Sequence, residues 1–406
     1  MKLSEELQWR GFYNQTTFDS PTNLDEQQYT LYLGTDPSAD SLHVGHLAVY
    51  MMVRRFLDHG HKVVLLVGGG TGIVGDPGGR DDERQILSLE KIAENKAALG
   101  QQVAGLFSGK DFELVDNYDW LKDVSILEFL RDVGKHFGMS QLVQRDYIAK
   151  RIGEGGSGIS YAEFSYTLLQ GYDYWHLHNN HGVNLQIGGS DQWGNILSGV
   201  ELIRKKEGDI VHAMTAPLVI NKATGKKFGK SEGGAVWLDP SKTSIYKFYQ
   251  FWLNADDEGA VEYLKLFTLL GKDDIDTITE NHAANPGARI AQKTLARELT
   301  DLVHGKERRE SVERVTEVLF GSRQFSDLSQ ADLDALAEEI PVVNTGKTIV
   351  ESLVEAQLAS SNGEARRLIV GGAISVNGQK VVDDRQLVEV SLLKKGKNSF
   401  ALVRTS

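Results

Sequence analysis

The sequence predicts an α/β fold with a doubly wound, nucleotide-binding first domain, then an α-helical domain and a small α+β domain. Three strand–loop–helix patterns, which begin at Tyr29, His61 and Asn184, indicate the first domain. Helical periodicity dominates residues 244–320 and indicates the second. Near the end of the chain an Asn-Gly pair at 377–378 joins two short β-like runs, which is typical of a hairpin.

The composition limits the kind of protein. With 406 residues, of which 41% are hydrophobic, the chain can bury a large core, and its length suggests about two to four domains. Disulfides, thiolate nucleophiles and cysteine-bound zinc are excluded because there are 0 cysteines, and the 11 histidines show no HExxH spacing. We therefore expect no protein-held metal. No apolar run approaches the roughly 18 residues of a membrane span, and the polar, acidic start differs from a signal peptide, so we expect a cytoplasmic protein.

The charge is unevenly distributed along the chain. The formal net charge of −12 argues against a general basic coat for nucleic acid, so any RNA contact has to come from a local patch. Residues 364–406 contain eight Lys or Arg and four acids, a net +4, so the preceding residues carry −16. The C-terminal segment is the expected RNA-binding part.

The first strand–loop–helix pattern runs from Tyr29 to His46. Residues that favour strands extend to Gly34, and a loop rich in Asp, Pro and Ser follows. Ser41 is the expected N-cap of the next helix, which puts His43 and His46 in its first turn, beside unpaired amide N–H groups and the positive end of the helix dipole. Such a helix start suits phosphate, although an isolated pair of histidines is more often a surface or core feature.

The second pattern places an apolar strand, His61 to Val67, before a glycine-rich loop that exposes backbone to a ligand. Asp76 follows, where a carboxylate either accepts backbone hydrogen bonds or receives an α-ammonium group. Arg80 and Arg84 lie near the start of a long polar helix expected over 81–107. Arginines at such a place ordinarily form charge pairs at the surface. We further expect a strand over 112–115 and a helix over 126–137.

The helix expected over 161–178 carries three polar residues on one face. Tyr166, Gln170 and Asp173 lie at positions i, i+4 and i+7, while apolar residues cover much of the remaining circumference. The helix should be largely buried, and its polar groups then need hydrogen-bond partners. These partners are either neighbouring side chains or a ligand.

The third pattern, from Asn184, again leads from a strand through paired glycines into a helix that extends to Lys206. Asp191 in its loop either accepts from ribose hydroxyls or caps the helix. Further along, Lys227 and Lys230 of the string KFGKS lie in a glycine-containing loop. Two such lysines can close over a polyphosphate and bring charge to a leaving group, although most lysine-rich loops are merely solvated.

The rest of the chain carries no catalytic constellation. Residues 326–341 hold five acids and no Lys or Arg, which suggests a solvated connector or a small helix. Two short helical patterns, ESLVEAQL and EARRLIV, then precede the expected hairpin.

Several of these strings resemble one enzyme family. YLGTDPSADSLHVGH resembles the first signature motif of the class I aminoacyl-tRNA synthetases in its tyrosine-specific form, and KFGKS, about 180 positions later, resembles the second. NLQIGGSDQWGN is similar to the corresponding segment of tyrosyl-tRNA synthetases, and the C-terminal hairpin with its basic residues resembles the alpha-L RNA-binding domain. The similarity to the bacterial tyrosyl-tRNA synthetases covers essentially the whole chain.

The resemblance implies the ligation of tyrosine to tRNA. ATP and L-tyrosine would form tyrosyl-adenylate and pyrophosphate, and the tyrosine would then pass to the 3′ end of tRNA(Tyr). Mg²⁺ would enter with ATP, and no zinc is expected. The family implies a cytoplasmic homodimer without membrane contact, with tRNA spanning both subunits. The implied domains are a Rossmann-like catalytic domain over 1–220 with a dimer-forming insertion near 118–182, the KFGKS loop and an anticodon-stem-binding helical domain over 221–325, a linker over 326–345 and an alpha-L-type RNA-binding domain over 346–406.

Residue by residue, the resemblance assigns four groups. Those for tyrosine are Tyr32 and Asp173 at the phenol, Asp76, Tyr166 and Gln170 at the ammonium group, and Thr71, Asn117 and Gln192 nearby. Those for the phosphates and catalysis are Ser38, His43, His46, Arg80, Arg84, Lys227 and Lys230. Those for ATP are Gly34, Asp36, Gly45, Gly189, Asp191, Lys230 and Ser231. RNA contacts fall on Arg366, Arg367, Lys394, Lys395 and Lys397.

Three positions depart from the commoner family pattern, and two other functions fit part of the sequence. Ser38 stands where threonine is frequent, Arg80 where lysine is frequent and Thr35 where an aromatic residue is frequent. A small-molecule nucleotidyltransferase shares the HxGH helix start, but it does not predict the pair of Tyr32 and Asp173. A catalytically inactive RNA-binding paralogue would keep the C-terminal module, but the intact histidines, lysines and pocket residues argue against it.

Overall fold

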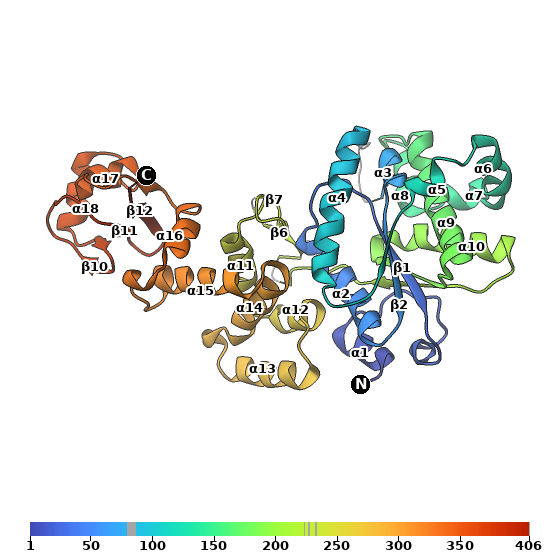
Figure 1. Ribbon diagram of the computed structural model, residues 1–406, viewed down its shortest axis with the longest axis horizontal. Coiled ribbons are helices and arrows are strands. Elements are labelled where there is room, and N and C mark those ends of the chain that lie inside the picture. The colour runs from blue at the N-terminus through green and yellow to red at the C-terminus, as the bar shows by residue number, and fades with distance from the viewer. Residues whose placement is uncertain (79–86, 223, 226–227, 232–233, 406) are drawn as a thin grey trace. The chain divides into compact units, whose positions relative to one another are not determined.

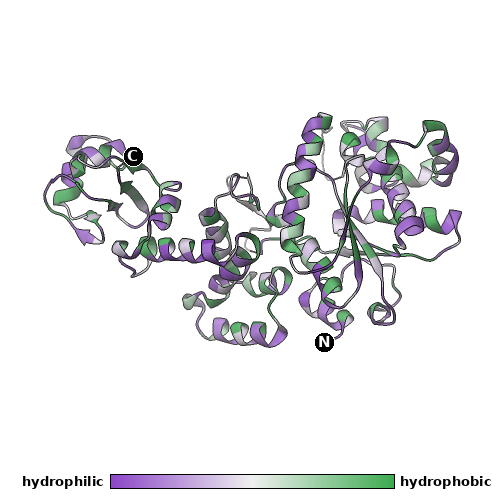
Figure 2. Ribbon diagram, viewed as in Figure 1, coloured by the Kyte–Doolittle hydropathy of each residue, from purple (hydrophilic) through white to green (hydrophobic). Residues whose placement is uncertain are grey.

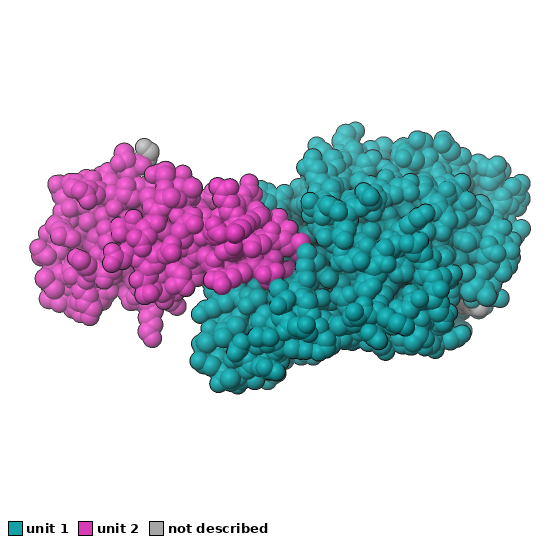
Figure 3. Space-filling model, turned by 60° about the horizontal axis from the view of Figure 1, so that its bottom comes forward, with its two compact units in different colours: residues 1–242, 253–295 teal, residues 243–252, 296–406 magenta. Residues whose placement is uncertain are grey.

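The computed structural model describes residues 1–78, 87–222, 224–225, 228–231 and 234–405. The chain forms two compact units, residues 1–242 with 253–295 and residues 243–252 with 296–406, shown in teal and magenta in Figure 3. The division falls within α11 (Ile245–Leu253) and within α14 (Ile290–His304). Among the helices of the described residues, none has both the length and the apolar character needed to cross a membrane.

A five-stranded parallel sheet lies at the centre of the first unit, in the order β3-β2-β1-β4-β5. Its strands are β1 (Thr30–Thr35), β2 (Lys62–Val67), β3 (Glu113–Asp116), β4 (Leu185–Gly189) and β5 (His212–Ala216). The chain moves outward from β1 to β2 and β3, and then continues on the other side of β1 with β4 and β5. This is the doubly wound topology that the sequence predicts, and it opens a crevice at the carboxyl ends of β1 and β4.

Helices cover both faces of this sheet. α2 (Val44–Asp58) and α4 (Leu89–Leu106) lie on one side, and α9 (Tyr161–His181) and α10 (Trp193–Lys206) on the other (Figure 1). Because both faces are covered, the strands are nearly continuous apolar runs, and the last five residues of β2 are all buried. Figure 2 shows the same contrast between hydrophobic central strands and hydrophilic outward helix faces.

The first unit contains further helices and a small two-stranded sheet. The helices are α1 (Leu3–Arg10), α3 (Thr71–Val74), α5 (Tyr118–Leu121), α6 (Ile126–Asp132), α7 (Met139–Leu142), α8 (Asp146–Ile152), α12 (Ala260–Phe267) and α13 (Lys272–Ala284), with 3-10 turns at Pro21–Asp25, Gly134–His136, Ser190–Gln192 and Pro286–Ala288. β6 (Lys230–Ser231) pairs antiparallel with β7 (Gly234–Ala235).

Two of the predicted helices are shorter than the sequence pattern suggests. α4 begins at Leu89, because Ser88 is extended and its hydroxyl accepts from the backbone N–H of Lys91 as an N-cap. Residues 81–86, where the helix was expected to start, lie outside the described residues. The helix expected over 126–137 ends at Asp132 and is followed by a 3-10 turn.

The prediction that Ser41 is the N-cap of α2 is wrong. The helix starts after His43, whose ring caps it by accepting from the backbone N–H of Gly45 at 3.0 Å. The preceding residues stay extended because they pair with a distant segment: the N–H of Leu238 donates to the carbonyl of Leu42 at 2.9 Å, and the N–H of Val44 donates to the carbonyl of Val236 at 2.8 Å. This long-range pairing moves the helix start beyond the local signal of the serine.

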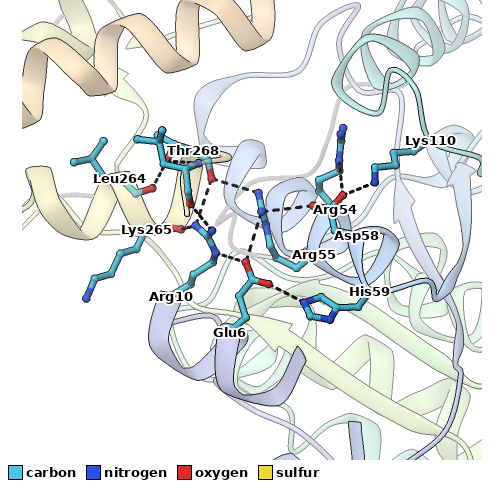
Figure 4. A network of polar contacts seen from close by, with 11 residues as sticks. Glu6, Arg10, Arg54, Arg55, Asp58, His59, Lys110, Leu264, Lys265 and Thr268 are labelled. Carbon is cyan, nitrogen blue, oxygen red and sulfur yellow. Dashed lines mark hydrogen bonds and ion pairs between the residues drawn. The ribbon is translucent and has the colours of Figure 1, made fainter. Parts of the chain in front are cut away.

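A network of buried charges joins α1, the C-terminal end of α2 and the end of α12 (Figure 4). Glu6 accepts from Arg10 at 2.7 Å and contacts the ring of His59 at 2.8 Å, and Arg55 lies 3.6 Å from it. Arg10 and Arg55 both donate to the backbone carbonyl of Thr268, which follows α12. Burial, reinforced by the neighbouring charge of Arg10, lowers the pKa of Arg55 to about 10. The network fixes the rear end of α2, the helix whose start suits phosphate.

The second unit combines helices with a small sheet. Its elements are α15 (Lys306–Phe320), α16 (Gln330–Ala337), α17 (Ile349–Glu355), α18 (Asn362–Val370), a 3-10 turn at Phe325–Asp327, and the strands β8 (Val342–Val343), β9 (Ile374–Val376), β10 (Gln379–Lys380), β11 (Ser391–Lys395) and β12 (Ser399–Val403) in the order β10-β9-β11-β12-β8. Leu353, Ile369 and Leu393 share one buried core. The predicted hairpin is confirmed, because Asn377 and Gly378 between β9 and β10 have φ values of 51° and 82°, as a two-residue turn requires.

Candidate active site

A cavity of about 290 Å³ opens at the carboxyl ends of β1 and β4, where the strand order reverses. The start of α2, the segment after β2 and α9 complete its walls. Most of the residues predicted from the sequence line it: Tyr32, Gly34, Asp36, Ser38, His43, Gly45, His46, Thr71, Asp76, Tyr166, Gln170, Asp173, Gly189, Asp191 and Gln192. These side chains come from four separate parts of the chain, and the fold brings them together.

Other predicted residues lie elsewhere. Asn117 does not line the cavity and is completely buried behind it. Arg80, Arg84 and Lys227 lie outside the described residues. For Lys230 and Ser231 the structure describes the backbone, which forms β6, and not the side chains.

Two buried polar groups lie at the inner end of the cavity. Tyr32 is 1% exposed, and its hydroxyl has no hydrogen-bond partner among the described residues. Asp173 is 2% exposed. Burial raises the pKa of Asp173 to about 7. Burial and the nearby charge of Asp173 also raise the pKa of Tyr32 well above its usual value. A buried hydroxyl without a partner costs free energy, so a ligand hydroxyl placed here would satisfy it.

Asp173 is held by two donors, one of which sequence reasoning missed. Nδ2 of Asn117 and Nε1 of Trp120 each donate to it at 2.8 Å. Asn117 also donates to the hydroxyl of Thr71 at 2.9 Å and accepts from the backbone N–H of Gly70 at 2.7 Å. The carboxylate and the glycine-rich loop are thereby locked together. The only local signal for Trp120 is its position one helical turn after Asn117.

The middle of the cavity is strongly acidic. Asp36 accepts from the hydroxyl of Tyr166 at 2.8 Å and from that of Thr71 at 2.7 Å. Asp76 accepts from Gln192 at 2.7 Å and from the backbone N–H of Gly78 at 2.9 Å. Burial and the charges of both carboxylates raise the pKa of Tyr166 well above its usual value. A cationic group would balance this negative charge.

The two histidines of the first motif form a stacked pair at the start of α2. Their ring centroids lie 3.8 Å apart with an interplanar angle of 20°. Nδ1 of His43 accepts from the N–H of Gly45, and Nδ1 of His46 accepts from the N–H of His43 at 3.2 Å. Each neutral ring therefore carries its proton on Nε2, which makes it a donor to an anion. Gly45 is required here, since an added Cβ would lie 2.8 Å from the ring of His43.

The second motif packs against this helix start. Gly229 has a φ of +92°, and an added Cβ there would lie 2.8 Å from the backbone nitrogen of Gly45. The carbonyl of Gly229 accepts from Val236, the residue that pairs with the start of α2. Phe228 is buried against Tyr263, with ring centroids 4.3 Å apart. The described part of KFGKS therefore lies beside the two histidines.

The predicted RNA contacts differ in exposure. Arg366 and Arg367 on α18 and Lys397 after β11 are exposed. Lys394 donates to the carbonyl of Leu319 at 3.1 Å, and Lys395 donates to that of Leu358 at 2.6 Å. The two lysines of β11 thus also contribute to the packing of the second unit.

For metal ions, the described residues contain no group of three or more His, Asp or Glu side chains placed to bind one.

Comparisons with known proteins agree along the whole chain. The family "tRNA synthetases class I (W and Y)" matches residues 24–321, and "Tyrosine--tRNA ligase SYY-like C-terminal domain" matches 332–405. Curated relatives include the tyrosine--tRNA ligase of Limosilactobacillus reuteri, 42% identical over 419 residues, and tyrosine--tRNA ligase 2 of Bacillus cereus, 44% identical over 422 residues, each with 100% of both chains covered. The solved C-terminally truncated mitochondrial tyrosyl-tRNA synthetase of Aspergillus nidulans is 31% identical, with a TM-score of 0.71 over 79% of this chain and 94% of that one.

Proposed function

The chain belongs to the class I tRNA synthetase family of the tryptophan and tyrosine enzymes, and we propose that its cavity binds L-tyrosine and ATP side by side for adenylate formation. Its full-length relatives are tyrosine--tRNA ligases, and the chain is an enzyme of this kind, which uses ATP to join tyrosine to tRNA. The observation that supports a phenol in the cavity is the buried pair of Tyr32 and Asp173, for which a ligand hydroxyl is the matching partner.

At the inner end, the tyrosine phenol donates to Asp173 and accepts from the hydroxyl of Tyr32. Phenylalanine would fill the same space but leave both groups unpaired, which costs more than the loss of an ordinary hydrogen bond. Tyrosyl-tRNA synthetases themselves exemplify this kind of discrimination, which makes editing unnecessary.

In the middle of the cavity, the α-ammonium group of tyrosine lies beside Asp76, Tyr166 and Gln170. It balances the charges of Asp36 and Asp76. Gln192 holds Asp76 by its hydrogen bond of 2.7 Å. Thr71 and Asn117 keep the neighbouring loop in register through the hydroxyl and amide contacts described above.

The phosphates of ATP bind at the start of α2. The carboxylate of tyrosine attacks the α-phosphorus, and pyrophosphate leaves with the Mg²⁺ that entered with the nucleotide. Negative charge that develops there is stabilised by the Nε2 protons of His43 and His46 and by the helix dipole. Further contacts come from Ser38, Arg80, Arg84, Lys227 and Lys230, and the nucleotide is bounded by Gly34, Asp36, Gly45, Gly189, Asp191 and Ser231. No covalent enzyme intermediate forms, so catalysis rests on positioning and electrostatics.

A homodimer is supported by large exposed apolar side chains within segment 118–182. Leu127 and Tyr161 are 76% and 71% exposed, and Ile126, Met139 and Ile152 are exposed as well. Contact with a second copy of the chain would remove their apolar surface from water. Sedimentation velocity should show a dimer, and a monomer at micromolar concentration would contradict the proposal.

tRNA would bind in part through the exposed cations of the second unit, Arg366, Arg367 and Lys397. We place this reaction in the cytoplasm, where tRNA, ATP and tyrosine meet. Deleting residues 348–406 should spare adenylate formation and impair transfer of tyrosine to tRNA. Equal loss of both steps would mean that this part of the chain is only structural.

Amino-acid-dependent exchange of pyrophosphate into ATP tests the core of the proposal. Exchange should occur with tyrosine and not with tryptophan or phenylalanine. Asp173→Ala should lose tyrosine binding and selectivity, and unchanged selectivity over phenylalanine would show that the phenol is bound elsewhere. Absence of exchange with any amino acid would refute adenylate formation by this cavity.

A further inference from the structure

A chain of hydrogen bonds extends from Asp76 away from the cavity, through α10 and α9, to Arg145. Nδ2 of Asn195 on α10 lies 3.5 Å from Oδ1 of Asp76 and 3.1 Å from the side-chain oxygen of Gln192. Oδ1 of Asn195 accepts from the hydroxyl of Thr167 on α9 at 2.6 Å, and Thr167 in turn accepts from Arg145. Asn195 is 4% exposed and Thr167 is 0% exposed, so these bonds form away from water.

The direction of the donors along this chain follows from its outer end. A guanidinium can only donate, so the oxygen of Thr167 accepts from Arg145 and its hydrogen points to Asn195. The amide oxygen of Asn195 is thereby engaged, and its NH₂ group faces the carboxylate of Asp76. A reversed amide would bring its oxygen against the carboxylate and leave the hydroxyl hydrogen of Thr167 without its acceptor.

We propose that Asn195 and Thr167 are positioning residues for the carboxylate of Asp76, and that Arg145 sets the polarity of the chain from the far side of α9. Neither Asn195, Thr167 nor Arg145 lines the cavity, so the three act on tyrosine only through Asp76 and Gln192. The inference rests on the proposed role of Asp76 as partner of the tyrosine ammonium group.

Arg145 also makes a hydrogen bond to α10. It lies between α7 and α8, within segment 118–182, and its second terminal nitrogen donates to the hydroxyl of Ser198 on α10 at 2.6 Å. Arg145 therefore holds α9 and α10 together at the outer end of the hydrogen-bond chain.

A pair of variants at Thr167 separates hydrogen bonding from packing. Thr167→Val removes the hydroxyl at nearly constant volume, and Thr167→Ser keeps it. Equilibrium dialysis would measure the dissociation constants of tyrosine and of 3-(4-hydroxyphenyl)propanoate, which has the phenol and the carboxylate but no ammonium group. Thr167→Val should weaken tyrosine binding about 10-fold and change that of the second ligand by less than about 2-fold, and Thr167→Ser should resemble the wild type.

The opposite results are equally definite. Equal weakening of both ligands in Thr167→Val would show a general packing defect, and unchanged tyrosine binding would show that the chain does not position Asp76; either overturns the proposal. If Thr167→Val does not fold, Arg145→Met and Arg145→Lys provide the same comparison from the partly exposed outer end, with selective loss of tyrosine affinity expected in Arg145→Met.

A separate control tests the premise that Asp76 binds the ammonium group of tyrosine. Asp76→Asn should weaken tyrosine binding far more than binding of the ligand without the ammonium group. If it does not, or if the wild type shows no tyrosine-dependent exchange, the proposed function of the cavity fails. If those tests succeed and Thr167→Val binds each ligand as tightly as Thr167→Ser does, only the positioning role fails.

Discussion

Replacing Trp120 with phenylalanine should shift the pH dependence of tyrosine binding. Burial raises the pKa of Asp173 to about 7, and hydrogen bonds from Asn117 and Trp120, both of 2.8 Å, oppose that rise. Trp120→Phe removes one donor and keeps an aromatic ring. A hydrogen bond to a charged group contributes about 2 kcal/mol, so its loss should raise the pKa of Asp173 further in the variant.

The sign of the effect follows from the form that binds the phenol. The carboxylate accepts the phenol hydrogen, so tyrosine affinity should increase as the pH rises through about 7 in the wild type. In the variant the same increase should occur at higher pH, which lowers affinity at neutral pH roughly 10-fold.

The ligand-free protein should respond to pH in the opposite direction. Because the pKa of Asp173 is raised from 3.8 to about 7 on folding, the folded state binds more protons than the unfolded state. The contribution of Asp173 to stability should therefore decrease between about pH 4 and 7.

Equilibrium dialysis over roughly pH 6 to 9 would measure the pH dependence of tyrosine binding in the wild type and in Trp120→Phe. Trp175→Phe is the matched control, because its indole nitrogen donates at 2.7 Å to Glu207, which is exposed. That variant should keep the wild-type profile. A loss of affinity in Trp120→Phe that does not depend on pH would refute the reasoning, since the indole would then contribute shape and not charge.

Three further substitutions test separate features. Tyr32→Phe should weaken tyrosine binding yet stabilise the ligand-free protein by about 1 kcal/mol in urea unfolding, because it removes a buried hydroxyl without a partner; a loss of stability would contradict this account. Gly45→Ala should abolish most pyrophosphate exchange, because the added Cβ would lie 2.8 Å from the imidazole of His43 and displace it. Gly105→Ala on α4 is the control, since its Cβ meets no atom within 4 Å, and it should keep the exchange activity. Equal activity of both variants would disprove the close fit. Arg314→Met should destabilise the second unit by about 2 kcal/mol, because the buried carboxylate of Asp332 loses the two bonds of 2.8 Å from Arg314 and keeps those from Ser311 and Ser329. Exchange activity should persist, and an unchanged urea midpoint would rule out that role.

Elements with a local cause were predictable from the sequence. β1, β2 and β4 appear as apolar runs because the middle of each strand is covered on both faces and buried. The hairpin turn at Asn377 and Gly378 was predictable because both positions need positive φ. The start of α2 was not, because the choice of His43 over Ser41 depends on pairing with residues nearly two hundred positions away.

By itself, the sequence determined the doubly wound order of elements, the helix start that suits phosphate and the two signature segments, because each depends on the identity and spacing of neighbouring residues. Only the tertiary structure decided which distant polar groups meet. Trp120 donates to Asp173, and Asn195 donates to Asp76, although nothing local in the sequence assigns either residue its partner. Buried donors and acceptors must be paired, and the packing of helices and strands far apart in the chain determines which partner each one finds.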